Sequence, residues 1–327
     1  MNSNNIFFFK NIVDSYYPDE KRPSVDISSV VNETAVSLKE ISDSDFEEIM
    51  ISCFIPDLYS GMGKSEKLFT KLTELMVGEW WRRIGGTYNL PTKKSGTEDV
   101  ELIKDDISIV CDAKVFRLGR SQKAPNVKDF LKLASVKLWI DNLNKKYLKT
   151  NSKHTVIGGL VTYSSLHEWE NDSEVYEECT NLDIPVVMFP YEILALLLKY
   201  KNNYSIKELN GLWSYRENRV NTSRNKASYW RYIKKYVCTL ISINSQQYDS
   251  EIKEYHSRII SAIAEYRKIV ESTIIETEKN ISTEMEQFKT IDELKEYALK
   301  MIISRDNCQA IEYLKHIDEF RTYKDLD

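Results

Sequence analysis

Two short apolar segments separated by a pair of aspartates limit the architectures open to this chain. Residues 99–103 and 107–116 alternate apolar and polar side chains and are rich in Val and Ile, which is typical of β-strands. The gap between them leaves room only for a tight hairpin with Asp105 and Asp106 at its turn. The chain is therefore predicted to contain an antiparallel strand pair whose register follows from that turn.

The segments after the hairpin predict that more strands join the same sheet. Residues 129–143 favour a helix, and residues 154–163 and 184–189 are apolar runs typical of buried strands. A further helix is expected over residues 190–200. Strand, helix and strand in that order imply a parallel, right-handed crossover. The first of these helices is expected to bury a stripe formed by Leu131, Ala134 and Leu138.

Helical patterns flank the predicted strands on both sides. Residues 66–84 repeat apolar side chains at three- and four-residue intervals, and Ser65 is placed to cap this helix. A shorter helix is expected within residues 44–55. From about residue 205 onward the pattern is helical, and its longest pieces are residues 229–242, 251–280 and 291–304.

These patterns predict an α/β protein with a mixed central sheet flanked by helices and with a helical C-terminal region. We divide the chain into a polar, partly helical N-terminal segment over residues 1–60, an α/β core over 61–204 and a helical region over 205–327. No internal repeat or low-complexity tract is evident.

The composition excludes several classes of protein. No apolar stretch approaches the roughly 20 residues that a membrane-spanning helix needs, and the N-terminus lacks the pattern of a signal peptide. The 5 cysteines are scattered and contain no CxxC pair, so neither a disulfide framework nor a cysteine-based zinc site is expected. A cytoplasmic protein with reduced thiols and no membrane contact is the resulting expectation.

The net charge of −5 conceals two basic blocks. Residues 114–153 contain 11 Lys and Arg against Asp129 and Asp141, and residues 199–235 contain 10 against Glu208 and Glu217. Basic blocks in an otherwise acidic chain suggest a localised face that binds a polyanion. The alternative is that each block is only a solvated helix face.

The predicted hairpin register brings three charged side chains together. With Asp105 and Asp106 in the turn, Asp99 faces Asp112, and cross-strand neighbours lie about 4.5–5.5 Å apart at Cβ. Asp112 and Lys114 leave the second strand on the same face. Two carboxylates this close repel each other unless a cation lies between them, and Mg²⁺ prefers such oxygen ligands. The alternative is a surface hairpin with an ordinary Asp–Lys pair.

The residues around this constellation resemble a known family. The runs Ser95–Val100, Cys111–Arg120 and Lys128–Phe130 are similar to segments of the HindIII-type restriction endonucleases, which belong to the PD-(D/E)xK nuclease superfamily. The local sequence D-A-K-x-F-R-L-x-R followed by K-D-F carries most of this resemblance, although Glu98 stands where the superfamily pattern has proline. The resemblance extends over residues 64–129 and further, to about residue 198. It implies a restriction-endonuclease-like core.

The resemblance also implies what the protein acts on and with. It implies a homodimer that cleaves both strands of palindromic double-stranded DNA with Mg²⁺ and leaves 5′-phosphate ends. The implied site is AAGCTT, cut between the two adenines of each strand. It further implies a functional pairing with a cognate DNA methyltransferase.

The chemistry of such a nuclease suggests a role for each candidate residue. Asp99 and Asp112 are expected to bind Mg²⁺, with the carbonyl oxygen of Ala113 as a further ligand. Lys114 is expected to orient or help deprotonate the attacking water and to stabilise the charge that grows on the phosphate. Glu66, on the preceding helix, is a further candidate as a ligand or base, and the alternative is an ordinary glutamate favoured by the helix dipole.

Candidate DNA contacts follow the catalytic strand and recur near the C-terminus. Arg117, Arg120 and Lys123 come directly after the strand and are expected to reach phosphates or guanine edges. The helical C-terminal region could form a dimer interface, a DNA clamp or both. The side chains suited to a clamp are Lys226, Arg231, Lys234 and Lys235.

Two other functions remain open on the sequence. One is another PD-(D/E)xK nuclease, such as a repair or junction-cleaving enzyme. The other is a non-catalytic DNA-binding protein built on a nuclease-like core. The intact set of Asp99, Asp112 and Lys114 favours an enzyme over a non-catalytic protein.

Overall fold

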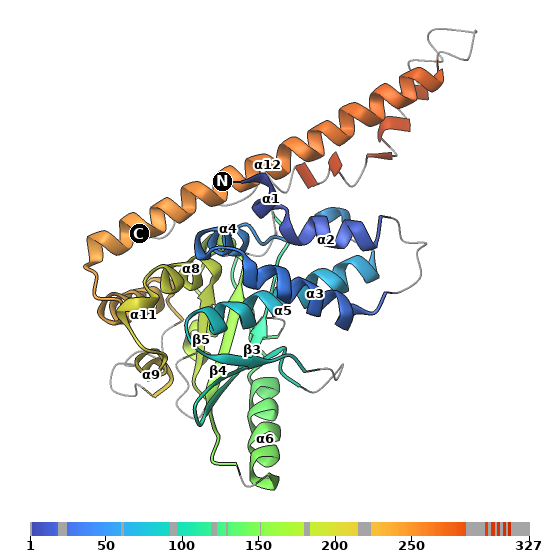
Figure 1. Ribbon diagram of the computed structural model, residues 1–327. Coiled ribbons are helices and arrows are strands. Elements are labelled where there is room, and N and C mark those ends of the chain that lie inside the picture. Colours follow the sequence, from blue (N-terminus) through green and yellow to red (C-terminus); the bar gives the residue numbers. More distant parts are fainter. Residues whose placement is uncertain are drawn as a thin grey trace.

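A five-stranded mixed sheet with helices packed around it forms the centre of the computed structural model (Figure 1). The structure describes residues 2–18, 25–59, 62–91, 97–118, 123–128, 130–150, 152–179, 184–214 and 224–285, together with parts of 298–314. The strands are β1 (Thr87–Asn89), β2 (Val100–Lys104), β3 (Ile107–Ala113), β4 (Thr155–Tyr163) and β5 (Val186–Pro190). They lie side by side in chain order.

The direction of the strands changes once across the sheet. Strands β1, β2 and β3 pair antiparallel, whereas β3, β4 and β5 pair parallel. The predicted mixed sheet is thus confirmed, and so is the parallel crossover between β3 and β4.

The register of the β2–β3 hairpin agrees with the register expected from its turn. Val100 faces Cys111 and Lys104 faces Ile107, which leaves Asp105 and Asp106 as the two-residue turn. Asp105 adopts a positive φ of 53°, a left-handed conformation that Asp tolerates better than most residues. The short turn therefore sets which side chains of β2 and β3 meet.

The crossover helix α6 (Leu133–Lys149) begins later than expected and buries a different face. It packs against β3 and β4. The predicted stripe is confirmed only in part, because Leu131 is buried but lies before the helix, and Leu138 is 50% exposed. The side chains that α6 buries are Val136, Leu143 and Tyr147.

Helix α5 (Gly63–Arg83) is the main helix against the hairpin side of the sheet, where it packs on β1, β2 and β3. Trp80 and Trp81 are buried and donate their indole N–H groups to the carbonyl oxygens of Leu194 and Ile103, both at 2.9 Å. The expected cap at Ser65 is wrong: the helix begins two residues earlier, and Ser65 is a buried residue of its first turn.

The N-terminal segment is more helical than its sequence predicted. Besides the expected short helix, now α4 (Asp43–Ile51), it contains α1 (Ser3–Ile6), α2 (Phe8–Tyr16) and α3 (Ile27–Glu40), followed by the 3-10 turn η1 (Asp57–Tyr59). Helices α2 and α3 pack on α5. Because both helices are short, their intrinsic helix propensity is not enough to keep them folded, and packing on α5 stabilises them.

The elements that follow β4, apart from β5, are η2 (Leu166–Glu168), α7 (Glu174–Glu178), α8 (Tyr191–Lys199), η3 (Lys201–Asn203), α9 (Ile206–Leu209), α10 (Gly211–Ser214), α11 (Lys226–Leu240) and α12 (Ser245–Met285). Among the described residues after about residue 205 the elements are helices, in agreement with the prediction, whereas η2 and α7, between β4 and β5, were not expected. The last expected helix, residues 291–304, falls largely outside the described residues.

Helix α12, late in the chain, contacts the N-terminal helices. This 41-residue helix runs past the N-terminal helices and extends beyond the body of the protein (Figure 1). The ring of Tyr266 packs edge-on against Phe7, with centroids 4.8 Å apart, and the Tyr255 hydroxyl donates to Glu47 at 3.1 Å. None of the helices described is long and apolar enough to cross a membrane.

Candidate active site

The β2–β3 hairpin places Asp99 and Asp112 beside each other where the two strands diverge. The backbone N–H of Asp99 donates to the carbonyl oxygen of Cys111 at 3.0 Å, so the pairing continues one residue beyond β2. In return, the N–H of Ala113 donates to Oδ2 of Asp99 at 3.0 Å. The carboxylate of Asp99 is thereby held against the end of β3, next to Asp112.

Lys114 completes this constellation from the residue directly after β3. Its Nζ lies 2.9 Å from Oδ2 of Asp112, and both side chains are largely buried. The main chain at Lys114 is held on both sides, because its N–H donates to the carbonyl of Thr162 at 3.0 Å and its carbonyl accepts from the Tyr191 hydroxyl at 2.6 Å. The ammonium group therefore projects from a fixed backbone.

A third carboxylate, Glu74 of α5, joins the site and was not among the residues that the sequence indicated. Glu74 is 3% exposed, and its two oxygens accept from Nζ of Lys71 at 2.8 and 2.6 Å. Burial raises the pKa of Glu74 and the nearby charge of Asp112 adds to this, while Lys71 opposes the shift. Glu74, which belongs to α5 rather than to the hairpin, therefore interacts electrostatically with the hairpin carboxylate Asp112.

The three carboxylates repel one another. Burial raises the pKa of Asp99 well above its usual range, and the charges of Asp112 and then Glu74 raise it further. The N–H of Ala113 acts in the opposite direction, since it stabilises the ionised form. Without a cation, the site therefore favours a protonated Asp99, and a bound cation would reverse that preference.

Glu66 occupies a different part of α5. Its Oε2 accepts from Nη2 of Arg117 at 2.8 Å, and Nε of Arg117 lies 3.4 Å from Asp57. Glu66 lies eight residues before Glu74 on α5, which corresponds to about 12 Å along a helix. The structure therefore joins Glu66 to Arg117 rather than to the hairpin carboxylates.

No sequence signal separates Glu74 from the other acids of α5. Glu66, Glu74 and Glu79 all lie on this helix, and only the packing of α5 on β3 decides which of them reaches Asp112. The seven-residue spacing from Lys67 to Glu74 indicates a shared helix face, but not that this face meets the hairpin.

The expected DNA-contacting residues are only partly described. Arg117 is half-buried in its ion pairs with Asp57 and Glu66. Lys123 is exposed, and its carbonyl accepts from the N–H groups of Glu170 and Asn171, both at 2.9 Å. Arg120 lies outside the described residues.

Two of the four proposed clamp residues of the second basic block, Lys226 and Lys234, are committed to contacts within the chain, whereas Arg231 and Lys235 are exposed on α11. Lys226 is buried and donates to the carbonyl of Trp169 at 2.6 Å, and Lys234 pairs with Asp249 at 2.5 Å. Within the same block, acidic partners also hold Lys199, Lys201 and Arg224. The cations of α6 differ, since Lys137, Lys145 and Lys149 are exposed.

The donor set at the hairpin fits Mg²⁺. No group of three or more His, Cys, Asp and Glu side chains arranged to hold a metal ion occurs among the residues described. Mg²⁺ does not require one, because it commonly binds through one or two carboxylates and completes its shell with water and substrate phosphate. Asp99 and Asp112 supply two such carboxylates. Because Asp99 is buried and repelled by the charges of Asp112 and Glu74, a bound cation would stabilise the ionised carboxylates.

Comparison with known proteins adds one match. The model of the family described as HindIII restriction endonuclease matches residues 22–309, which is most of the chain and includes every residue of the candidate site. No curated protein sequence matches the chain.

Proposed function

Because the chain belongs to the HindIII restriction endonuclease family and is thus a type II site-specific deoxyribonuclease, we propose that it cuts both strands of a short palindromic DNA site with Mg²⁺. The site proposed from the resemblance is AAGCTT, and the products carry 5′-phosphate ends. The observation that carries the proposal is the arrangement at the end of β3, where Lys114 lies 2.9 Å from Asp112 and the N–H of Ala113, between them, donates to Asp99 at 3.0 Å.

Each side chain has a role that its position supports. Asp99 and Asp112 would hold Mg²⁺, together with the carbonyl of Ala113, and Glu74 would add negative charge or a water-mediated contact from α5. When bound, the metal supplies a water of lowered pKa and positive charge next to the phosphate. Lys114 then orients that water and stabilises the charge that develops on the phosphate oxygens.

The ion pair between Lys114 and Asp112 also positions the ammonium before substrate arrives. A group held in place by the fold needs little reorganisation during the reaction, and this is the main source of electrostatic catalysis. The anchored main chain at Lys114, between Thr162 and Tyr191, supports such a fixed position.

The remaining parts of the proposal concern partners and location. Because a palindromic site has two-fold symmetry, we propose a homodimer, whose two symmetry-related active sites each cut one strand. A cell that contains such an enzyme must protect its own sites, so we propose a cognate DNA methyltransferase as the functional partner. Action on cellular and invading DNA places the enzyme in the cytoplasm.

Digestion of a plasmid of known sequence with the purified protein and Mg²⁺ tests the proposal. Discrete fragments whose ends share one palindromic sequence and ligate without added kinase are expected. Nicking that depends on branched or mismatched structure would instead identify a repair or junction-cleaving nuclease. Binding without cleavage under all divalent metals would identify a non-catalytic DNA-binding protein.

A further inference from the structure

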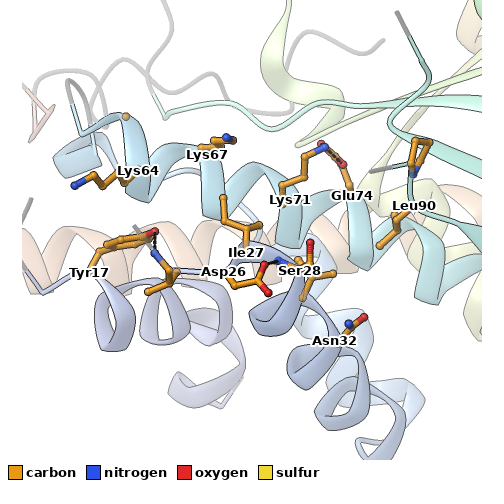
Figure 2. A pocket seen from close by; sticks show the side chains of 14 residues that line it. Tyr17, Asp26, Ile27, Ser28, Asn32, Lys64, Lys67, Lys71, Glu74 and Leu90 are labelled. Carbon is orange, nitrogen blue, oxygen red and sulfur yellow. Dashed lines mark hydrogen bonds and ion pairs between the residues drawn. The ribbon is translucent and has the colours of Figure 1, made fainter. Parts of the chain in front are cut away.

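Three lysines follow one another along a groove on helix α5. Lys64, Lys67 and Lys71 are spaced by three and four residues, so they share one face of the helix. The groove has a volume of about 580 Å³, and its opposite wall is the start of α3 with Leu90 and Pro91. Figure 2 shows the lysines in order along α5, with Glu74 after Lys71.

The groove and the candidate active site share Glu74. Glu74 is one of the residues that line the groove, and it is also the buried carboxylate whose charge acts on Asp112 and Asp99. Lys71 contacts Glu74 directly, so the lysine face of α5 adjoins the site. DNA held along this face would therefore lie close to the hairpin carboxylates.

The described lining of the groove combines positive charge with few acids. Lys67 is exposed, Lys64 is half-buried, and Lys71 binds Glu74. Among the described lining residues the acids are Glu74 and Asp26, and Asp26 caps α3 by accepting from the N–H of Ser28 at 3.0 Å. The positive charge of Lys71 already offsets the negative charge of Glu74. The other charged side chains among the described lining residues are Lys64, Lys67 and Asp26, so positive charges outnumber negative ones.

We propose that Lys64 and Lys67 bind backbone phosphates of the DNA strand that enters the candidate active site along α5, while Lys71, next along the same helix face, stays paired with Glu74. The proposal rests on the nuclease function proposed above and identifies where DNA next to the scissile bond is held. Contacts of this kind fix the position of the duplex and carry no sequence information. They would therefore act equally on cognate and non-cognate DNA.

The lysines lie within reach of phosphates a few nucleotides from the scissile bond. Lys67 and Lys64 lie seven and ten residues before Glu74, which is about 10.5 and 15 Å along a helix at 1.5 Å per residue. One strand advances by about 3.4 Å per nucleotide along the duplex axis, so these lengths correspond to about three and four nucleotides when α5 lies along that axis. Both contacts would therefore fall on one flank of the scissile bond.

The first test is the salt dependence of DNA binding by the full chain in Ca²⁺, with a 30-base-pair duplex that contains AAGCTT and one that lacks it. Each phosphate contact contributes about −0.9 to the slope of log K against log salt. Lys64→Ala combined with Lys67→Ala should make the slope less steep by about two contacts on both duplexes. Lys39→Ala, an exposed lysine at the far end of α3, is the matched control and should leave the slope unchanged.

A second test locates the contacts on the DNA. Single phosphates on the flank are replaced by neutral methylphosphonates, and the loss of affinity is compared between wild type and Lys67→Ala. Neutralising the phosphate that Lys67 binds should lower the affinity of the wild-type protein. The same change should leave the affinity of Lys67→Ala unaltered, because this variant already lacks the interaction. Asp26→Asn retains a capping side chain and removes a negative charge, so it should tighten binding several-fold.

The outcomes separate this proposal from the proposed function. An unchanged slope in the double variant, with wild type still cutting DNA at a fixed site, overturns the phosphate contacts and leaves the nuclease intact. Wild-type protein that neither binds nor cuts DNA overturns both. The variants must melt at the same temperature as wild type for this comparison to hold. We expect that they do, because the substituted lysines are exposed or half-buried on α5.

Discussion

The ammonium of Lys114 lies 2.9 Å from a carboxylate oxygen of Asp112, which stands two residues earlier in the chain, near the end of β3. Residues two positions apart in an extended chain point to the same face, so this contact follows directly from the strand geometry. The pair is largely buried, and it is joined by Asp99 across the hairpin and by Glu74 from α5. Single-residue changes can therefore separate the role of each group.

Lys114→Ala should separate DNA binding from chemistry. Loss of a positioned charge at the reacting phosphate acts mainly in the transition state, and we expect single-turnover cleavage to fall by about 10²–10⁴-fold. The binding isotherm in Ca²⁺ should change little. Without divalent metal the melting temperature should fall slightly, since Asp112 loses its partner. Lys104→Ala, at the other end of the hairpin, is the control, and cleavage by Lys114→Ala at the wild-type rate would contradict the assignment.

Asp112→Asn should abolish cleavage and also change the response of stability to metal. The substitution removes the carboxylate that pairs with Lys114 at 2.9 Å, so the metal-free protein should melt at a slightly lower temperature than wild type. Wild type should gain stability as Mg²⁺ is added, because a ligand of the folded state stabilises it by mass action. The variant should gain little. Asp106→Asn, on the exposed turn, should behave as wild type in both measurements.

Glu74→Gln and Glu66→Gln should differ strongly in activity. Glu74 stands beside the hairpin carboxylates, so its neutral analogue should lower cleavage by about 10-fold or more and raise the Mg²⁺ concentration needed, in the range seen for groups that support a metal site. Glu66 binds Arg117, and its replacement should alter cleavage only a few-fold. Mg²⁺ titrations of the initial rate measure both. A larger loss of cleavage in Glu66→Gln than in Glu74→Gln would contradict the assignment of Glu74 and favour Glu66 as the active-site residue.

Glu192→Gln should change how stability depends on pH. Burial raises the pKa of Glu192 to about 7, and hydrogen bonds from Ser165 and Leu166 partly oppose the shift. Between about pH 4.5 and 7 the unfolded chain loses this proton while the folded protein keeps it, so the contribution of Glu192 to stability falls as pH rises, by at most about 1.4 kcal/mol per pH unit. Below this window the contribution is constant.

The variant lacks this titration. The free energy of unfolding of Glu192→Gln minus that of wild type should therefore increase from about pH 4.5 to 7 and then level off. Urea unfolding at a series of pH values measures the difference, and other carboxyls common to both proteins cancel from it. A difference that does not vary with pH would show that Glu192 titrates normally in the folded state.

The sequence by itself determined the parts of the protein that depend on local geometry. Two aspartates between alternating apolar segments leave a two-residue turn, and that turn sets the register that brings Asp99 to Asp112. Alternation along β3 then places Lys114 beside Asp112. The order of strands and helices likewise led to the parallel crossover, because few connections are possible over so short a chain segment.

The tertiary structure decided what depends on how the elements pack against one another. Glu66 and Glu74 lie on the same helix and are equally plausible by pattern, but the position of α5 on the sheet brings only Glu74 to the hairpin carboxylates. Leu138 was expected to be buried, yet α6 docks through Val136, Leu143 and Tyr147. Which face of a helix is buried, and which charges meet across elements, is set by long-range contacts that no local pattern records.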